Sequence, residues 1–363
     1  MSKPEFSDTD AGYMIRALEL ARRGLLTTDP NPRVGCVIVN QGEVVGEGWH
    51  QYAGQAHAEV NALIHAGERA RGSTVYVTLE PCCHVGRTPP CADTLVNSGV
   101  ERVVVAMEDP NPLVSGKGLH RLKEAGVMTQ SGLFKHEAMQ LNPGFIKRMQ
   151  TGRPLIRSKI AMSLDGRTAM ASGESKWITG PESRKDVHKI RARSSAIATG
   201  SGTLLADNPS LTARLDDPSI HLRQPSRILL DSRLTSSPDA KFFTINDDWH
   251  LLTSQKPDQE VRARIHQLKS SSTGVDLEAV ADWLGANAFN EVLFECGAIL
   301  NGALLASGIV DEWIIYMAPK ILGDRGRGIF HLPLLESLSE APDLKLIDSR
   351  QVGADIRFTL IPR

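Results

Sequence analysis

The chain has 363 residues, of which 41% are hydrophobic and 23% are charged. This composition is that of an ordinary globular protein, and the length exceeds what one compact core usually holds, so we expect two or three domains. Lys and Arg number 41 against 42 Asp and Glu, a balance that argues against a protein that binds nucleic acid through a basic surface.

The cysteines are few and clustered. There are five of them, and three fall between residues 82 and 91. Metal binding in a reducing compartment explains such a set better than a disulfide framework. The N-terminal residues lack the apolar core of a signal peptide, and no apolar run approaches the length of a membrane span. We therefore expect a cytoplasmic protein with neither nucleic-acid nor membrane partners.

The first 150 residues alternate between helical and extended patterns. Ser7 or Asp8 caps the first predicted helix, which has Ile15, Leu18 and Ala21 on one face and ends near residue 23. The other elements expected here are a hairpin of strands 34–39 and 43–49, strands 74–79 and 102–106, and helices from 57, 91–96, 119–125 and 137–149. This order predicts a three-layer α/β sandwich.

Three metal-binding side chains stand at the ends of these elements. His57 opens a helix, whose buried side should include Val60, Leu63 and Ile64. Cys82 follows a strand, and Cys91 opens the next helix. One imidazole and two thiolates suit Zn²⁺, and a zinc ion with three protein ligands keeps a position open for water.

Glu59 follows His57 by two residues, so it can point at such a water and move its proton without being a ligand. The order His-x-Glu, then Pro-Cys, then Cys is typical of zinc-dependent nucleobase deaminases, although eight residues separate Cys82 from Cys91 here instead of two. Two alternatives stay open. Cys83 or His84 could complete a closed structural site, which would leave Glu59 without a role, or Cys82 and Cys91 could form a disulfide.

The second half begins after a linker at 151–154, which places the predicted domains at 1–150 and 151–363. Its predicted strands are 155–161, 196–199, 227–231, 250–253, 292–295, 313–318 and 356–360. Its predicted helices are 182–193, 260–268, 277–285 and 298–307, whereas 232–248 and 269–275 are expected to be loops. The pattern predicts a second α/β domain.

Polar residues follow several of these strands. Glu295-Cys296-Gly297 leads into a helix whose free N–H groups could hold a phosphate, and Asp231-Ser232-Arg233 could hold an additional one, such as that of NADPH. Gly200-Ser201-Gly202 reads as a tight turn. The segments 163–168 and 205–209 are either ligand-binding loops or structural turns. Arg191 and Arg214 are candidate clamps for a substrate phosphate, or merely surface residues.

The chain resembles the bifunctional deaminase/reductases of riboflavin biosynthesis nearly from end to end. The segments that carry the resemblance are 31–36, His57-Ala58-Glu59-Val60, 80–91, Ser163-Leu164-Asp165-Gly166-Arg167, 173–175, 177–179 and 205–209. The long insert between Cys82 and Cys91 is specific to this branch of the deaminases. The resemblance implies a cytidine-deaminase-like α/β/α domain followed by a dihydrofolate-reductase-like α/β domain.

The resemblance also implies two reactions and their residues. The first domain would hydrolyse the 2-amino group of 2,5-diamino-6-(5-phosphoribosylamino)pyrimidin-4(3H)-one, and the second would use NADPH to reduce the ribosyl side chain to ribityl. One zinc ion per chain would be held by His57, Cys82 and Cys91, with Glu59 as the catalytic proton shuttle. The implied NADPH contacts are Ala161, Trp177, Thr203, Asp207, Ser232 and Gly297. The implied substrate contacts are Ser175, Arg191, Leu211, Arg214 and Glu295.

Lys159 and Asp207 could steer the carbonyl end of the ribose, and a homo-oligomer is expected. The chain departs from the family pattern at Cys83 and Val85, where Ser and His are common, and at Cys296, where a small residue is usual. Three rival interpretations remain: a nucleic-acid deaminase, a metal-stabilised binding protein without catalysis, and a deaminase whose reductase half is inactive.

Overall fold

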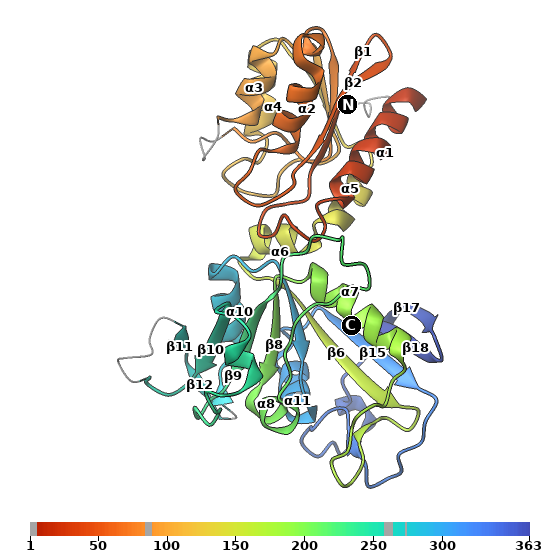
Figure 1. The fold of residues 1–363 in the computed structure, drawn as a ribbon, viewed down its shortest axis with the longest axis vertical. Coiled ribbons are helices and arrows are strands. Elements are labelled where there is room, and N and C mark those ends of the chain that lie inside the picture. Colours follow the sequence, from red (N-terminus) through yellow and green to blue (C-terminus); the bar gives the residue numbers. More distant parts are fainter. Residues whose placement is uncertain (1–5, 84–88, 258–263, 273) are drawn as a thin grey trace. The chain divides into compact units, whose positions relative to one another are not determined.

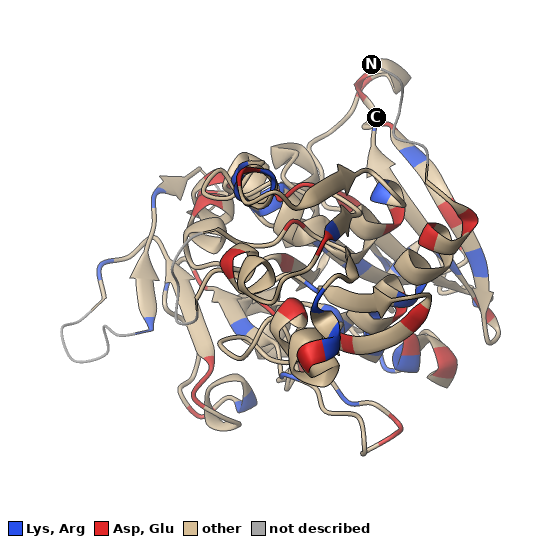
Figure 2. Ribbon diagram, turned by 90° about the horizontal axis from the view of Figure 1, so that it is seen from above, with Lys and Arg blue, Asp and Glu red and all other residues tan. Residues whose placement is uncertain are grey.

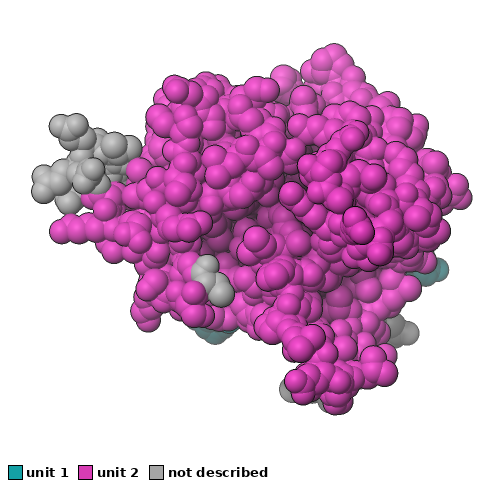
Figure 3. Space-filling model, turned by 90° about the horizontal axis from the view of Figure 1, so that it is seen from below, with its two compact units in different colours: residues 1–152 teal, residues 153–363 magenta. Residues whose placement is uncertain are grey.

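The structure is a computed structural model that describes residues 6–83, 89–257, 264–272 and 274–363. It divides into two compact units, residues 1–152 (unit 1) and 153–363 (unit 2). Figure 1 shows the elements of each unit and Figure 3 distinguishes the units by colour. Basic and acidic residues are interspersed over the ribbon in Figure 2.

Unit 1 is built on a five-stranded sheet with the order β2-β1-β3-β4-β5. Its strands are β1 (Gly35–Asn40), β2 (Glu43–Trp49), β3 (Thr74–Val77), β4 (Arg102–Val105) and β5 (Met128–Ser131). Its helices are α1 (Asp8–Arg22), α2 (Ala58–Ala66), η1 (Gly67–Ala70), α3 (Cys91–Asn97), α4 (Lys117–Glu124), α5 (Lys135–Leu141) and α6 (Pro143–Thr151). The helices α2, α3 and α4 lie on one face, and α1 and α5 lie on the other (Figure 1). The three-layer α/β/α prediction is confirmed.

Small residues let the helices approach this sheet closely. A Cβ atom on Gly35 would lie 2.0 Å from the Ala17 carbonyl oxygen of α1, and one on Gly48 would lie 2.4 Å from the Ala58 carbonyl oxygen of α2. Because α2 packs through alanines, Ile64 faces solvent with 70% of its surface exposed, so its predicted burial is wrong. Ile15 in α1 is likewise 45% exposed.

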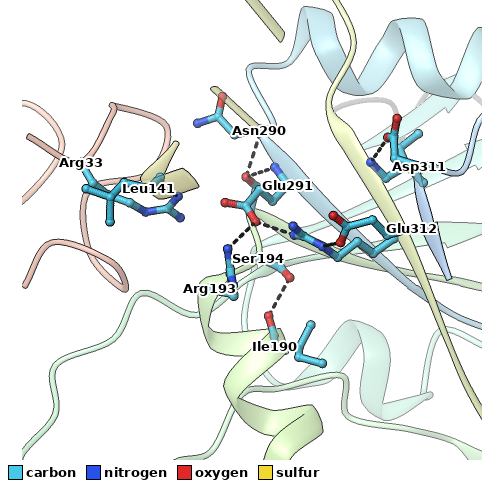
Figure 4. Close-up of polar contacts among 12 residues, drawn as sticks. Arg33, Leu141, Ile190, Arg193, Ser194, Asn290, Glu291, Asp311 and Glu312 are labelled. Atoms are coloured by element: carbon cyan, nitrogen blue, oxygen red, sulfur yellow. Dashed lines mark hydrogen bonds and ion pairs between the residues drawn. The ribbon is translucent and has the colours of Figure 1, made fainter. Parts of the chain in front are cut away.

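The helix predicted at 137–149 is two helices, α5 and α6, which break at Asn142. The Asn142 side chain accepts a hydrogen bond from the Arg33 backbone N–H at 2.8 Å and donates one to the Arg33 carbonyl at 3.0 Å, and Pro143 then begins α6. The Arg33 guanidinium also donates to the Leu141 carbonyl (Figure 4). These bonds fix the chain just after Asn31-Pro32 and explain why a single helix does not form.

Unit 2 contains a nine-stranded sheet with the order β11-β10-β9-β8-β14-β6-β15-β18-β17. Its strands are β6 (Leu155–Ser163), β8 (Ala196–Gly200), β9 (Ser226–Leu230), β10 (Trp249–Thr253), β11 (Ile265–Gln267), β14 (Glu291–Glu295), β15 (Glu312–Ala318), β17 (Leu344–Val352) and β18 (Asp355–Pro362). Neighbouring strands from β11 to β15 in this order are parallel. Strand β18 pairs antiparallel with β15, and β17 pairs antiparallel with β18. The predicted α/β class is confirmed.

The remaining elements of unit 2 surround this sheet. They are the helices α7 (Pro181–Arg193), α8 (Ser201–Asp207), α9 (Lys241–Thr244), α10 (Leu277–Ala286), α11 (Ala298–Ser307) and η3 (Leu338–Glu340), and the short strands β7 (Arg167–Ala169), β12 (Ser270–Ser271), β13 (Gly274–Val275) and β16 (Arg327–Gly328).

Several predictions for unit 2 are wrong. Residues 265–267 of the predicted helix 260–268 form strand β11, which pairs with β10, and residues 260–263 lie outside the described residues. Residues 201–207 form helix α8 instead of a tight turn and a polar loop. The expected loop 232–248 contains α9, and β12 and β13 pair within the expected loop 269–275. These short elements depend on pairing and packing that the local pattern does not reveal.

A buried charge network joins the amino ends of three strands of unit 2. Arg157 on β6 contacts Glu291 on β14 and Glu312 on β15, each at 2.5 Å, and Arg193 also lies 3.4 Å from Glu291 (Figure 4). Glu291 is 1% exposed, so removing either sign from this network would leave an uncompensated buried charge. The network holds together β14, β6 and β15, which are neighbours in the sheet.

Two histidines in adjacent strands of unit 2 should make the stability of this unit depend on pH. His250 Nδ1 lies 3.1 Å from His266 Nε2, and both rings pack on Trp283. Burial lowers the pKa of both imidazoles below 6.5. Because the unfolded chain then binds more protons, stability should fall as the pH drops below about 6.5. NMR titration of the two ring Cε1–H signals should give midpoints under 6.5, and a midpoint at or above 6.5 for both would contradict the prediction.

No helix in the described part of the chain combines the length and the apolar character that a membrane crossing requires.

Candidate functional site

The three predicted metal ligands lie together in unit 1. His57 is the N-cap of α2, Cys82 lies on the segment between β3 and α3, and Cys91 is the first residue of α3. His57 Nδ1 is 3.6 Å from Cys82 Sγ and 3.3 Å from Cys91 Sγ, and all three donor atoms lie within 4.8 Å of one another. Two sulfurs and one imidazole nitrogen at this spacing fit a zinc ion with three protein ligands.

The two thiols of the cluster have different acidities. The hydrogen bond with Cys91, together with contacts to His57, lowers the pKa of Cys82, whereas the same hydrogen bond and burial raise the pKa of Cys91. The contact with Cys82 also raises the pKa of His57. A bound cation would stabilise both sulfurs as thiolates, the form in which cysteine ligates a metal.

Glu59 lies in the first turn of α2 and is 3% exposed. Burial raises the pKa of its carboxyl group to about 7, and the carboxyl lies within hydrogen-bonding reach of the Cys91 thiol. A carboxyl group with a pKa near neutrality can both accept and donate a proton at working pH. Glu59 therefore places a buried carboxyl group beside the donor cluster.

A polar pair beside the cluster was not among the predicted site residues. His50 is 3% exposed, and its ring centroid lies 5.4 Å from that of His57. Its Nδ1 lies 3.1 Å from the Ala56 carbonyl oxygen, so it donates there, and Nε2 then accepts from the Asn31 amide at 3.1 Å. Asn31 and His50 thus present fixed polar groups next to the metal ligands. The hairpin that carries His50 was predicted, but nothing local distinguished this histidine.

Cys83 does not belong to the donor cluster formed by the described residues. Its thiol lies 3.9 Å from the Leu113 carbonyl oxygen. His84 and Val85, the other positions raised as an alternative ligand or as a departure from the family, lie outside the described residues.

We expect Cys83→Ala to retain one zinc ion per chain, because its thiol is not a ligand in this arrangement. Inductively coupled plasma mass spectrometry of the purified variant should give wild-type stoichiometry. Cys91→Ala is the matched positive control and should fall well below one zinc per chain. Loss of zinc from Cys83→Ala would instead support the closed, structural metal site.

The second candidate site lies at the carboxyl ends of the parallel strands of unit 2, on the face where Figure 3 shows a hollow. Glu295, the last residue of β14, is 8% exposed. Its carboxylate contacts Lys159 Nζ at 2.9 Å and receives two bonds from the Arg191 guanidinium, at 2.5 and 2.9 Å. Burial alone would raise the pKa of Glu295, but these two cations hold it well below its usual range.

The loop predicted to bind phosphate after β14 is held rigidly. A Cβ atom on Gly297 would lie 3.9 Å from Thr203 Oγ1, so the predicted cofactor contacts on α8 and α11 are neighbours. Asn301 on α11 donates to the Cys296 carbonyl at 3.1 Å and accepts from the Ser158 hydroxyl at 2.8 Å. The Cys296 thiol donates to the same Asn301 oxygen, so this departure from the family is accommodated by a hydrogen bond.

The other predicted reductase residues differ in what they offer. The exposed Trp177 ring lies under the Arg184 guanidinium at 4.7 Å, and Asp207 pairs with Lys176 at 3.4 Å. The Ser232 hydroxyl accepts from the Val275 N–H at 2.9 Å, which ties this turn to β13. Ala161 lies in β6 and Ser175 on the segment that follows β7, both half-buried.

Two predicted substrate residues need a closer description. Arg214 is exposed, and its backbone N–H donates to His188 Nδ1 at 3.2 Å. Leu211 is 2% exposed, and its side chain packs in a small core with Leu204 and Phe242. Any contact of Leu211 with a substrate must therefore come from its backbone.

Asp165 organises this end of unit 2 and was quoted only as part of a motif. Its carboxylate accepts from the Ser163 hydroxyl at 2.5 Å and from the backbone N–H groups of Leu322 and Gly323 at 3.1 and 2.8 Å. These bonds lower the pKa of Asp165 to about 2. The residue therefore joins the turn after β6 to the segment after β15.

Each unit matches a known protein family. Residues 7–107 match the cytidine and deoxycytidylate deaminase zinc-binding region, and residues 154–358 match the RibD C-terminal domain. Riboflavin biosynthesis protein RibD of Escherichia coli is 50% identical and covers 97% of this chain and 99% of its own length. The protein of the same name from Haemophilus influenzae is 48% identical, with 99% of both chains covered.

Solved structures agree with these matches. Acinetobacter baumannii RibD superposes with a TM-score of 0.91 at 45% identity, covering 98% of this chain and 99% of that one. A diaminohydroxyphosphoribosylaminopyrimidine deaminase/5-amino-6-(5-phosphoribosylamino)uracil reductase from Thermotoga maritima gives 0.86 at 33% identity, with the same coverage. The resemblance inferred from the motifs is confirmed. The chain belongs to the RibD family of riboflavin-biosynthesis proteins and combines a zinc-binding deaminase domain with a reductase domain.

Proposed function

We propose that the chain carries out two consecutive steps on one phosphorylated pyrimidine. Residues 1–150 hydrolyse the 2-amino group of 2,5-diamino-6-(5-phosphoribosylamino)pyrimidin-4(3H)-one, and residues 151–363 reduce the ribosyl side chain to ribityl with NADPH. The observation that carries the proposal is the convergence of His57, Cys82 and Cys91 beside the buried Glu59. The similar Thermotoga maritima protein bears the names of both activities.

In the first step His57, Cys82 and Cys91 would hold one zinc ion, which when bound lowers the pKa of water and stabilises negative charge on oxygen. Glu59 accepts a proton from the attacking water, and the water oxygen bonds to C2 of the pyrimidine. Glu59 then returns the proton to the amine as the C2–N bond breaks and ammonia leaves. The position of Glu59 supports this role, because its buried carboxyl group lies in the first turn of α2, two residues after His57.

In the second step NADPH supplies the hydride, and the chain orients both reactants. We propose Ala161, Trp177, Thr203, Asp207, Ser232 and Gly297 as cofactor contacts. We propose Ser175, Arg191, Arg214, Glu295 and the backbone of Leu211 as substrate contacts, with Lys159 and Asp207 near the carbonyl end of the ribose. The proximity of Thr203 to Gly297 and the bonding of Arg191 to Glu295 support these sets.

We also propose a cytoplasmic homo-oligomer. The described cysteines Cys36, Cys82, Cys83, Cys91 and Cys296 are all free thiols, as in a reducing compartment. The sheet of unit 2 ends in the nine-residue strand β17, where Leu346 and Ile347 are 51% and 48% exposed. An edge strand of this length, with two exposed apolar side chains, is suited to pairing with a second copy.

The test is mass spectrometry of the pyrimidine phosphate after incubation with and without NADPH. Loss of the amine without cofactor, followed by reduction only with it, would support both halves of the proposal. Amine loss that never leads to reduction would leave a deaminase with an inactive second half. An untouched substrate despite bound zinc would reject the small-molecule assignment, and RNA substrates would then be tested.

A further inference from the structure

A second segment of unit 1, residues 109–119, packs on the turn that carries the metal ligand Cys82. The segment follows β4 and leads into α4. It contacts the neighbours of Cys82 on both sides. The Glu80 carboxylate reaches it from one side, and on the other the Cys83 thiol lies 3.9 Å from the Leu113 carbonyl oxygen.

Glu80 makes the strongest of these contacts. The residue is 3% exposed, and its Oε2 accepts from the backbone N–H groups of Asp109 and Gly116 at 3.1 and 2.9 Å. Its Oε1 accepts from the Leu119 N–H at 3.1 Å. Three backbone donors directed at one buried carboxylate compensate its lost hydration. The catalytic mechanism uses none of them.

The backbone of Pro81 is in close contact with the first turn of α4. A Cβ atom on Gly118 would lie 2.1 Å from the Pro81 carbonyl oxygen and 3.2 Å from Glu80 Oε1, so α4 rests directly on this backbone. Cys82 is in turn bonded to α3, because its carbonyl accepts from the Ala92 N–H at 3.1 Å and its sulfur accepts from the Cys91 N–H at 3.3 Å. The turn is therefore held between α4 and α3.

We propose that Glu80 is a positioning residue of the deaminase site, which fixes the Cys82 turn against residues 109–119 and so sets the place of the Cys82 sulfur. The inference rests on the proposed zinc site. A carboxylate is suited to this role because both of its oxygens accept hydrogen bonds, whereas an amide has one acceptor and one donor. Glu80→Gln would therefore direct an NH₂ group at one or more backbone N–H donors.

The experiment measures zinc release from the full-length, zinc-loaded chain to the chromogenic chelator 4-(2-pyridylazo)resorcinol, well below the unfolding temperature. Glu80→Gln should release zinc roughly 10- to 100-fold faster than the wild type, the effect typical of residues that orient metal ligands. Glu101→Gln, the same change at an exposed carboxylate of unit 1, is the matched control and should match the wild type. Reductase activity of the same sample reports whether unit 2 is intact.

Gly118→Ala is the second variant, because it displaces Pro81 without removing any charge. Alanine is favoured over glycine within helices, so faster zinc release from this variant would come from its contact with Pro81. If Glu80→Gln does not fold, zinc release from Gly118→Ala tests whether the contact between α4 and the Cys82 turn sets the zinc site. Wild-type zinc release in both variants, or a lower melting temperature with unchanged zinc release, would overturn the proposal. A wild-type chain that binds no zinc would instead defeat the proposed function.

Discussion

Glu59→Gln should reduce the deaminase kcat by roughly 10²- to 10⁴-fold, the range expected when a general acid–base group is removed. The amide keeps the size of the side chain in its buried position but can neither accept a proton from water nor return one to the amine. Zinc stoichiometry should stay at the wild-type value, because Glu59 is not part of the donor cluster. The measurement is the rate of ammonia release from the pyrimidine phosphate under saturating substrate.

The reductase unit supplies the internal control for this variant. With the deaminated intermediate as substrate, NADPH oxidation by Glu59→Gln should equal that of the wild type, because Glu59 belongs to unit 1. A deaminase rate within a factor of about three of the wild type would show that another group moves the proton. Loss of zinc together with activity would show that Glu59 maintains the metal site instead.

The metal site was predictable because its signal is local. His57, Cys82 and Cys91 stand at a helix cap, after a strand and at a helix start, and each of these positions follows from a pattern of a few residues. The chemistry of one imidazole and two thiols then restricts the function strongly. The layer order of unit 1 follows equally well from the alternation of strands and helices.

The supporting residues could not be predicted because their partners are distant in sequence. Glu80 bonds to residues 29–39 positions later, and Asp165 bonds to Leu322 and Gly323 across almost half of the chain. A lone acidic residue has no local mark of such a role. The predicted burial of Ile64 was wrong for a related reason. Its exposure depends on the glycines of β2, which let α2 pack through alanines.

Glu295→Gln should lower the free energy of unfolding of unit 2 by about 3–5 kcal/mol, because it leaves Lys159 and Arg191 without their buried counter-charge. Chemical denaturation followed by the fluorescence of the tryptophans is the measurement. Asp282→Asn is the matched control. It removes the 63%-exposed partner of Arg153, and exposed pairs contribute at most about 1 kcal/mol.

The pH dependence of stability should change in the same variant. The pKa of Glu295 is depressed below its model-peptide value of 4.5 in the folded chain. Its contribution is therefore present above pH 4.5 and is lost as the pH falls below that value, because the unfolded chain then binds more protons. In Glu295→Gln, the free energy of unfolding should therefore fall less steeply than in the wild type as the pH drops below 4.5. An unchanged acid profile would show that Glu295 does not carry it.

Catalysis in unit 2 should fail in Glu295→Gln even where the domain remains folded. The Arg191 guanidinium donates two hydrogen bonds to the Glu295 carboxylate and one to the Thr212 carbonyl at 3.1 Å. If Arg191 contacts the substrate as proposed, a displacement of about 1 Å costs roughly 10²-fold in rate, so the reductase kcat/KM should fall by about that factor while ammonia release is unchanged. A reductase of wild-type efficiency in a destabilised unit 2 would limit Glu295 to a structural role and remove it from the proposed substrate contacts.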